Sequence, residues 1–123
     1  MAKKVLIIED DLFLRDIIFQ ELQSAGYETH YAVDGEEGLK KISEVKPDLV
    51  LLDIILPGID GFEILKRKQE NPEIAEIPVV ILSNLGQKEE IDRGMRLGAK
   101  DYLIKAHFTP DEVLQKVKQV LGE

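Results

Sequence analysis

The sequence predicts an α/β fold with a doubly wound sheet of five parallel strands, and three observations support that prediction. Short apolar runs alternate five times with amphipathic stretches along the 123 residues. Most runs are apolar at consecutive positions, which is typical of strands covered by helices on both faces. Strict alternation of strands and helices gives an open sheet with right-handed crossovers. No linker or low-complexity stretch interrupts the pattern, so one domain over residues 1–123 is expected, with no output domain.

The expected strands are residues 5–8, 28–32, 49–52, 79–82 and 102–104. The second is mixed in character, because it contains Thr29, His30 and Tyr31, and it suits the edge of the sheet. Each of the other four expected strands is followed directly by a polar residue. In chain order these residues are Glu9, Asp53, Ser83 and Lys105.

The first two expected helices have clear stop and start signals. The first places five apolar residues on one face and ends at Gly26; these residues are Leu14, Ile17, Ile18, Leu22 and Ala25. The second follows Asp34, with Glu37 three residues later, a spacing that resembles a capping box. Its apolar face is Leu39, Ile42 and Val45.

The last three helices are shorter or begin at stronger signals. Phe62 and Leu65 mark a short third helix. Ile91 and Met95 mark a fourth, which Gly98 ends. The run TPDE at residues 109–112 is a strong start for the fifth, since it combines a cap, a first-turn proline and a glutamate. The apolar face of this helix is Val113, Val117, Val120 and Leu121.

Composition excludes several classes of function. The chain has 24 Asp plus Glu against 16 Lys plus Arg, a net charge of −8, which weighs against binding to nucleic acid or anionic lipid. It has no cysteine, so disulfides and thiolate sites are excluded. No apolar run approaches the roughly 18 residues of a membrane span. The apolar run near the start, residues 5–8, is too short for the core of a signal peptide, so a cytoplasmic location is expected.

The polar residues at the strand ends predict a common site, because ligands of open α/β sheets bind outside the carboxyl ends of the strands. Glu9, Asp10 and Asp53 would repel one another unless a cation joins them. Oxygen ligands favour Mg²⁺, which in turn favours a phosphoryl ligand. Lys105 would neutralise that ligand, Ser83 would donate a hydrogen bond to it, and an aspartate carboxylate could attack phosphorus.

Each of these residues also has an ordinary structural interpretation. Asp10 and Asp11 could favour the N-terminus of the first helix, and Asp53 could be a turn residue. Ser83 could begin a loop and Lys105 could be one more surface lysine. The joint occurrence at the ends of different strands favours a shared site.

The chain resembles the receiver domain of bacterial two-component response regulators, of the stand-alone chemotaxis type, over essentially its whole length. The matching motifs are VLIIEDD at 5–11, DIILPGIDG at 53–61, ILS at 81–83 and GAKDYLIK at 98–105. The resemblance implies a flavodoxin-like sheet in the order 2-1-3-4-5. It implies that Asp53 is the phosphoacceptor. It also implies four ligands for Mg²⁺: Glu9, Asp10, Asp53 and the backbone carbonyl of Ile55.

The resemblance also assigns a switch. Ser83 would turn toward the phosphoryl group, Lys105 would neutralise it, and Tyr102 would change rotamer on activation. Residues 87–121 would carry the surface that signals to a partner. The expected function is a phosphorylation-activated signalling switch, not an enzyme beyond its own phosphoryl transfer and dephosphorylation. The phosphodonor would be a sensor histidine kinase or a histidine phosphotransfer protein, and the receiver of the signal a downstream target protein or the next member of a phosphorelay.

Four positions depart from the family pattern or stand out in it. Ala106 follows Lys105 where relatives carry proline after a cis bond, and a cis bond before another residue costs about 2.5–4 kcal/mol, so the geometry here is left open. Asn84 replaces a small residue. Ile55 and Leu85 are apolar at positions that flank the site, and they are expected to hinder water and prolong the phosphorylated state.

Other interpretations stay open at this point. One is a receiver excised from a longer regulator, and another is an interaction module of the same fold that is not phosphorylated. A flavodoxin-like electron carrier is disfavoured, since Glu9, Asp10 and Asp11 would repel a flavin phosphate. An aspartate-dependent phosphatase of the haloacid type would need a second Asp at Ile55.

Overall fold

The structure, a computed structural model, describes residues 2–123 and contains five parallel strands in the order β2-β1-β3-β4-β5. The strands are β1 Lys4–Ile8, β2 Glu28–Ala32, β3 Leu49–Leu52, β4 Val79–Ser83 and β5 Asp101–Ile104. The helices are α1 Leu12–Ser24, α2 Gly35–Val45, α3 Gly61–Gln69, α4 Lys88–Arg96 and α5 Pro110–Leu121, with a short 3-10 turn, η1 Lys105–His107. The predicted fold and strand order are confirmed, and every predicted strand lies within one residue of its observed bounds.

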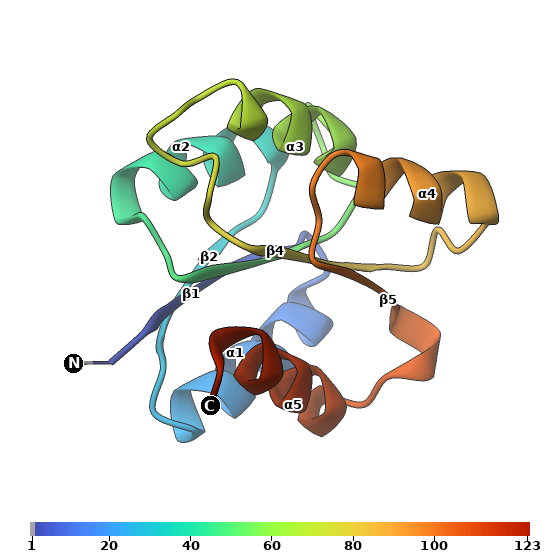
Figure 1. Cartoon of the computed structure of the whole chain (residues 1–123). Helices are drawn as coiled ribbons and strands as arrows, with labels where there is room; N and C mark the ends of the chain where they lie inside the picture. The colour runs from blue at the N-terminus through green and yellow to red at the C-terminus, as the bar shows by residue number, and fades with distance from the viewer. Residues whose placement is uncertain (1) are drawn as a thin grey trace.

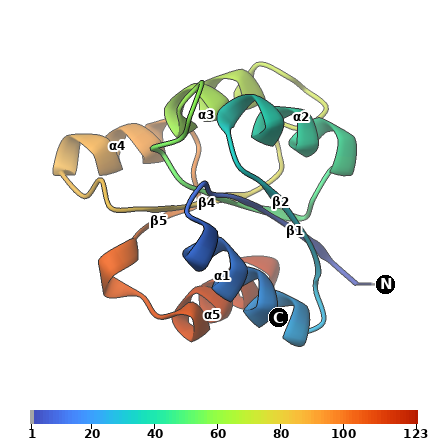
Figure 2. The ribbon, with the colours of Figure 1, turned by 180° about the vertical axis from the view of Figure 1, so that it is seen from behind.

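The sheet separates two apolar layers. Helices α2, α3 and α4 cover one face, and α1 and α5 cover the other (Figures 1 and 2). Successive strand residues face opposite layers: Leu6 and Ile8 pack on the first side, Val5 and Ile7 on the second. Because both faces are covered, β1, β3 and β4 are apolar at nearly every position, as the sequence predicts.

The helix ends follow the predicted signals with one difference. Thr109 and Glu112 form a complete capping box at the start of α5. At α2 the Asp34 carboxylate accepts from Glu37 N at 2.8 Å, which is half of the expected box. The Glu37 carboxylate instead lies 3.6 Å from Lys41 Nζ, so it pairs along the helix surface.

Three apolar residues assigned to helix faces are exposed instead. They are Ile17 and Ala25 in the first helical segment and Met95 on α4, whereas Ile18 and Leu22 of α1 are buried. Helix α4 buries only Gly94 fully, where a Cβ atom would lie 2.6 Å from Ile81 Cδ1. Helix α4 thus contacts the sheet closely through this glycine. The face that it buries is smaller than the apolar face that periodicity predicts.

The peptide bond before Ala106 is trans, as is every other peptide bond within residues 2–123. The 3-10 turn η1 begins directly at Lys105 and carries the chain from β5 toward α5. No helix within residues 2–123 is both long and apolar enough to cross a bilayer.

Candidate functional site

Glu9 and Asp53 leave the sheet side by side at the carboxyl ends of β1 and β3. Ile8 and Leu52 are register partners in the two strands. The ladder continues one residue further, since Asp53 N donates to Ile8 O and Glu9 N donates to Ala32 O, each at 3.0 Å. The backbone of each acidic residue is thereby fixed, and both carboxylates are buried.

The loop after Asp53 folds back tightly against the site. Ile55 N donates to Asp53 Oδ1 at 3.3 Å, and Gly61 N donates to Ile54 O at 2.9 Å. A Cβ atom at Gly61 would lie 2.6 Å from the Asp53 carbonyl oxygen, which no real side chain tolerates. A glycine at the start of α3 is therefore needed to bring that helix against the site.

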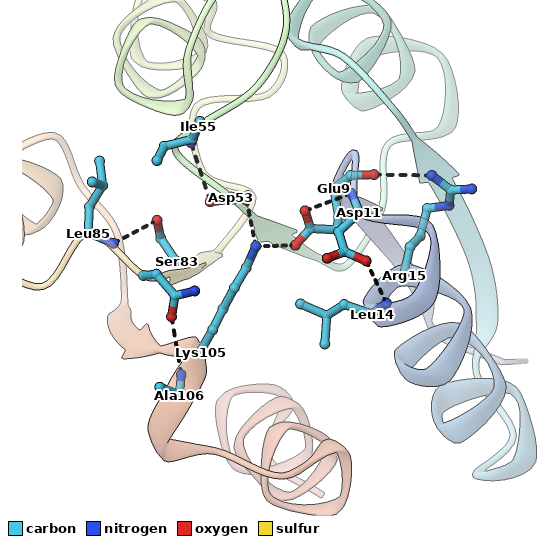
Figure 3. A network of polar contacts seen from close by, with 11 residues as sticks. Glu9, Asp11, Leu14, Arg15, Asp53, Ile55, Ser83, Leu85, Lys105 and Ala106 are labelled. Carbon is cyan, nitrogen blue, oxygen red and sulfur yellow. Dashed lines mark hydrogen bonds and ion pairs between the residues drawn. The ribbon is translucent and has the colours of Figure 1, made fainter.

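Lys105 reaches across from β5 and joins the two carboxylates. Its Nζ atom lies 2.6 Å from Glu9 Oε1 and 2.7 Å from Asp53 Oδ2 (Figure 3). The side chains of Lys105, Glu9 and Asp53 are only 16%, 4% and 6% exposed. Charge-assisted hydrogen bonds of this length are stronger than hydrogen bonds between neutral groups. Because the three side chains are little exposed, solvent and salt screen the attraction between them only weakly.

The electrostatics of the three groups follow from burial and proximity. Burial raises the pKa of Glu9 to about 7, the Asp53 charge adds to the rise, and the hydrogen bonds from Lys105 and Asp11 N oppose it. Burial would lower the pKa of Lys105, but its hydrogen bonds to Asp53 and Glu9 outweigh burial and raise that pKa. Lys105 thus stays an ammonium ion, which partly compensates the clustered negative charge.

A cavity of about 550 Å³ opens above Asp53. It is lined by Glu9, Asp10, Asp11, Leu12, Phe13, Asp53, Ile55, Asn84 and Lys105. Its floor carries the buried groups of Glu9, Asp53 and Lys105. Its rim carries exposed side chains, among them Asp10 and the apolar Phe13, which is 81% exposed. A small charged group can therefore enter from solvent and reach the Asp53 carboxylate.

Three carboxylates in this cavity can converge on one cation. One oxygen each from Glu9, Asp10 and Asp53 lies within 4.8 Å of the others. All three donors are hard oxygen atoms, which suit Mg²⁺ better than zinc or copper. The residues present therefore fit a magnesium ion, as the sequence predicts.

Ser83 and Tyr102 stand beside this cavity and do not line it. Ser83, the last residue of β4, is fully buried, and its hydroxyl accepts a hydrogen bond from Leu85 N at 3.3 Å. The Tyr102 hydroxyl donates to Leu85 O. Both predicted switch residues therefore contact the same residue of the loop between β4 and α4.

The structure separates two neighbouring acids that the sequence left ambiguous. Asp11 caps α1, because its carboxylate accepts from Leu14 N at 3.1 Å, so the ordinary interpretation is correct for Asp11. Asp10 is exposed and joins the carboxylate cluster.

Four lining residues were not predicted as part of the site: Asp11, Leu12, Phe13 and Asn84. Leu12 and Phe13 precede the predicted apolar face of the first helix. That position is the sequence signal that could have placed them in the site. Asn84 was identified only as larger than the family residue. Its place in the site depends on how the chain turns after β4.

Comparison with known proteins finds one family over nearly the whole chain. Residues 5–118 match the family described as the response regulator receiver domain. Among curated proteins, the transcriptional regulator RpaA of Synechocystis, described as DNA-binding, is 39% identical over 118 residues, covering 96% of this chain and 48% of RpaA. The alkaline phosphatase synthesis transcriptional regulatory protein PhoP of Bacillus subtilis is 38% identical, covering 98% of this chain and 49% of PhoP. The chain spans about half the length of the curated relatives it matches.

Solved structures show the same fold at nearly full coverage. A CheY-like response regulator receiver domain protein from Methanospirillum hungatei superposes with a TM-score of 0.91 at 30% identity, covering 99% of this chain and 95% of that one. The chemotaxis response regulator CheY4 of Vibrio cholerae gives 0.90 at 30% identity, with 98% and 99% covered.

Proposed function

Because this chain belongs to the response regulator receiver domain family of two-component systems, we propose that it is a signalling switch phosphorylated on Asp53. The observation that carries the proposal is the Asp53 carboxylate at the floor of an open cavity, bonded to Lys105 and next to two further acids. The phosphodonor is a phosphohistidine of a sensor histidine kinase or a histidine phosphotransfer protein.

The transfer needs one nucleophile and charge neutralisation. An Asp53 carboxylate oxygen forms a bond to phosphorus while the bond from phosphorus to the donor imidazole nitrogen breaks. The imidazole leaves with the electron pair and keeps one proton, so it departs neutral. Lys105 is already within hydrogen-bond distance of Asp53 and stabilises the charge on the transferred oxygens.

Glu9, Asp10 and Asp53 would hold Mg²⁺. The backbone carbonyl of Ile55 is proposed as the fourth ligand. When bound, this ion supplies positive charge to the phosphoryl oxygens. In the proposal Glu9 and Asp10 act only as ligands of this ion, whereas Asp53 is both a ligand and the phosphoacceptor.

The phosphorylated state then acts on the loop after β4. A phosphoryl group adds about two negative charges that need hydrogen-bond donors. The Ser83 hydroxyl, which now accepts from Leu85 N, is free to donate its own proton to that group. Its movement would reach Leu85, to which the Tyr102 hydroxyl is bonded, and so bias the surface of residues 87–121.

Two downstream partners fit this switch. One is a separate target protein or phosphorelay member that reads the changed surface of a single receiver domain, residues 1–123. The other is an output domain of the same polypeptide, as in the longer regulators that the chain matches. The switch turns over no substrate beyond its own phosphoryl group in either arrangement.

The decisive experiment is a mass measurement after incubation with acetyl phosphate and Mg²⁺. Wild-type protein is expected to gain one base-labile phosphoryl group, whereas Asp53→Asn gains none. Asp92→Asn on α4 serves as the matched control, since within residues 2–123 its carboxylate forms an ion pair only with the exposed Lys88. A wild-type protein that gains no phosphate, or an Asp53→Asn variant that gains the same phosphate, would show that the assignment is wrong.

The two flanking apolar residues are expected to differ in their effect on lifetime. Ile55 is exposed and lines the cavity, whereas Leu85 packs against the core beside it. We therefore propose that Ile55 shields the phosphoryl group from water. The phosphorylated form of Ile55→Asn is expected to lose its label faster than wild type, with Leu85→Glu showing the smaller change. Equal half-lives for Ile55→Asn and wild type would contradict the shielding role.

A further inference from the structure

The segments that carry Ser83 and Lys105 are joined by one side-chain hydrogen bond just beyond the end of the sheet. Ser83 and Ile104 are register partners in β4 and β5, so the following residues, Asn84 and Lys105, emerge next to each other. Ala106 N donates to Asn84 Oδ1 at 3.2 Å, the bond that ends at Ala106 in Figure 3. We call this bond the Asn84–Ala106 clasp.

The clasp satisfies a donor that the turn itself leaves free. The first N–H groups of any helical turn lack a partner within the turn. In η1 the closing bond runs from Phe108 N to Lys105 O at 3.3 Å, and it leaves Ala106 N available. Proline has no N–H, so alanine at position 106 is what allows Asn84 to bind there. Two positions at which this chain departs from its family pattern therefore form one interaction.

The Asn84 side of the clasp belongs to a short segment that is bonded at each residue. Ser83 Oγ accepts from Leu85 N, and Leu85 O accepts from the Tyr102 hydroxyl. Asn84 contributes the remaining bond, and it is the residue of this segment that lines the cavity above Asp53.

We propose that Asn84 is a positioning residue that holds two segments at a set separation. One is residues 83–85, called the Ser83 segment, and the other is η1, residues 105–107, called the Lys105 segment. Asn84 acts through the Ala106 N–H and does not itself react. Both groups then approach a phosphoryl group on Asp53 together, and a shift of the Ser83 segment is transmitted directly to η1 and α5. The role in phosphoryl transfer rests on the proposed function, whereas the clasp itself does not.

Amide hydrogen exchange at Ala106 tests the clasp without any phosphorylation. Asn84→Leu keeps four side-chain heavy atoms branched at Cγ but has no acceptor, and it should speed exchange about 2- to 10-fold, the effect of losing one net hydrogen bond. Asn84→Asp keeps an acceptor and should preserve the wild-type protection. Asn71→Leu is the matched control, since Asn71 Oδ1 accepts from Glu73 N in a distant loop and should leave Ala106 unchanged.

Phosphorylation kinetics with acetyl phosphate and Mg²⁺ test the positioning role. Asn84→Leu should lower the maximal rate about 2- to 10-fold and leave the half-saturating acetyl phosphate concentration within about twofold, because positioning acts on the reaction step. Ala106→Pro removes the donor, so adding Asn84→Leu to it should change the rate by less than about twofold. If Ala106→Pro does not fold, the Asn84→Leu and Asn84→Asp pair decides the question alone.

The results separate the two proposals. Unchanged exchange at Ala106 in Asn84→Leu, or equal exchange in Asn84→Leu and Asn84→Asp, overturns the clasp. An Asn84→Leu effect that is fully retained in the Ala106→Pro background overturns its action through Ala106. Failure of the wild-type protein to take up phosphate overturns the proposed function and leaves the exchange result for the clasp intact.

Discussion

Lys105 and Lys68 are both largely buried lysines, and they have opposite electrostatic surroundings. Lys105 Nζ contacts the carboxylates of Glu9 and Asp53 at 2.6 and 2.7 Å, and these hydrogen bonds raise its pKa in spite of burial. Lys68 on α3 is 4% exposed and donates to the neutral Ala75 carbonyl at 2.7 Å. Burial there lowers the pKa of Lys68.

The difference shows that burial alone does not mark a functional group. The apolar stem of Lys68 packs in the interior, and its ammonium group donates to a backbone carbonyl, so Lys68 has a structural role. Within the described part of the chain, Lys105 is the ion-pair partner found for the carboxylates of Glu9 and Asp53. The buried Arg15 donates to the Glu9 backbone carbonyl at 3.4 Å. Three substitutions test how far partners, rather than burial, decide the energetic contribution of a cation.

The largest effect is expected for Lys105→Met. The substitution leaves two buried carboxylates without their cation, which costs about 3 kcal/mol of unfolding free energy. Urea titration at pH 8 measures it, because that pH lies above the Glu9 pKa of about 7. The raised pKa of Lys105 means that its contribution is present below about pH 10.4 and is lost only as pH rises through the folded-state pKa.

The same variant tests the cation site. Millimolar Mg²⁺ should restore part of the lost stability, because it replaces the ammonium charge, and Glu9→Gln in the same background should weaken that restoration. Lys40→Met is the control, since the Lys40 ammonium lies 4.0 Å from Glu44 on an exposed helix face and contributes about 0.5 kcal/mol or less. A Lys105→Met protein as stable as this control would contradict the prediction.

A smaller effect of opposite sign is expected for Lys68→Met. The substitution removes a desolvated charge and one hydrogen bond while keeping the apolar stem, so stability at pH 7 should stay equal or rise by up to about 2 kcal/mol. Because the folded-state pKa of Lys68 is lowered, the penalty is fully present below that pKa. The advantage of Lys68→Met should therefore shrink as pH rises toward about 10.4. A loss of more than about 1 kcal/mol at pH 7 would show that the Ala75 contact outweighs burial.

The smallest effect is expected at Asp101, whose carboxylate lies 2.7 Å from Lys116 Nζ at a partly exposed position. Burial alone would raise the pKa of Asp101, but hydrogen bonds from Lys116 and Tyr102 N lower it. Its contribution is thus present above about pH 3.9 and is lost as pH falls through the folded-state pKa. Asp101→Asn should cost about 0.5–1 kcal/mol at pH 7, measured by urea titration. If the unfolding free energies of Asp101→Asn and wild type are equal at pH 7, the Asp101–Lys116 pair contributes no more than a fully exposed pair, which would contradict the prediction.

Much of the fold could be predicted from local patterns. Runs such as residues 49–52 are apolar at every position because both faces of the sheet are covered, and that requirement is visible in the sequence. Ile17, Ala25 and Met95 are exposed and were wrongly assigned to apolar faces. Periodicity records which side chains are apolar, whereas the depth of a helix against the sheet depends on close contacts such as that of Gly94.

The convergence of the acidic residues could also be predicted, because strand ends of a parallel sheet meet at one edge. The positions of Ser83 and Tyr102 beside the cavity could not, since their hydroxyls are directed by Leu85 backbone groups of a loop with no periodic pattern. Asn84 escaped prediction for the same reason.

The sequence by itself determined the alternation of strands and helices, the two-sided core, and the residue types that stand at the strand ends. Those features depend on side-chain polarity along a chain of regular geometry. The tertiary structure alone decided which partners each polar group found: Lys105 with Glu9 and Asp53, Asp11 with the first turn of α1, Asn84 with Ala106. Hydrogen bonds form over about 3 Å, so their pairing depends on where separate strands and loops come to lie.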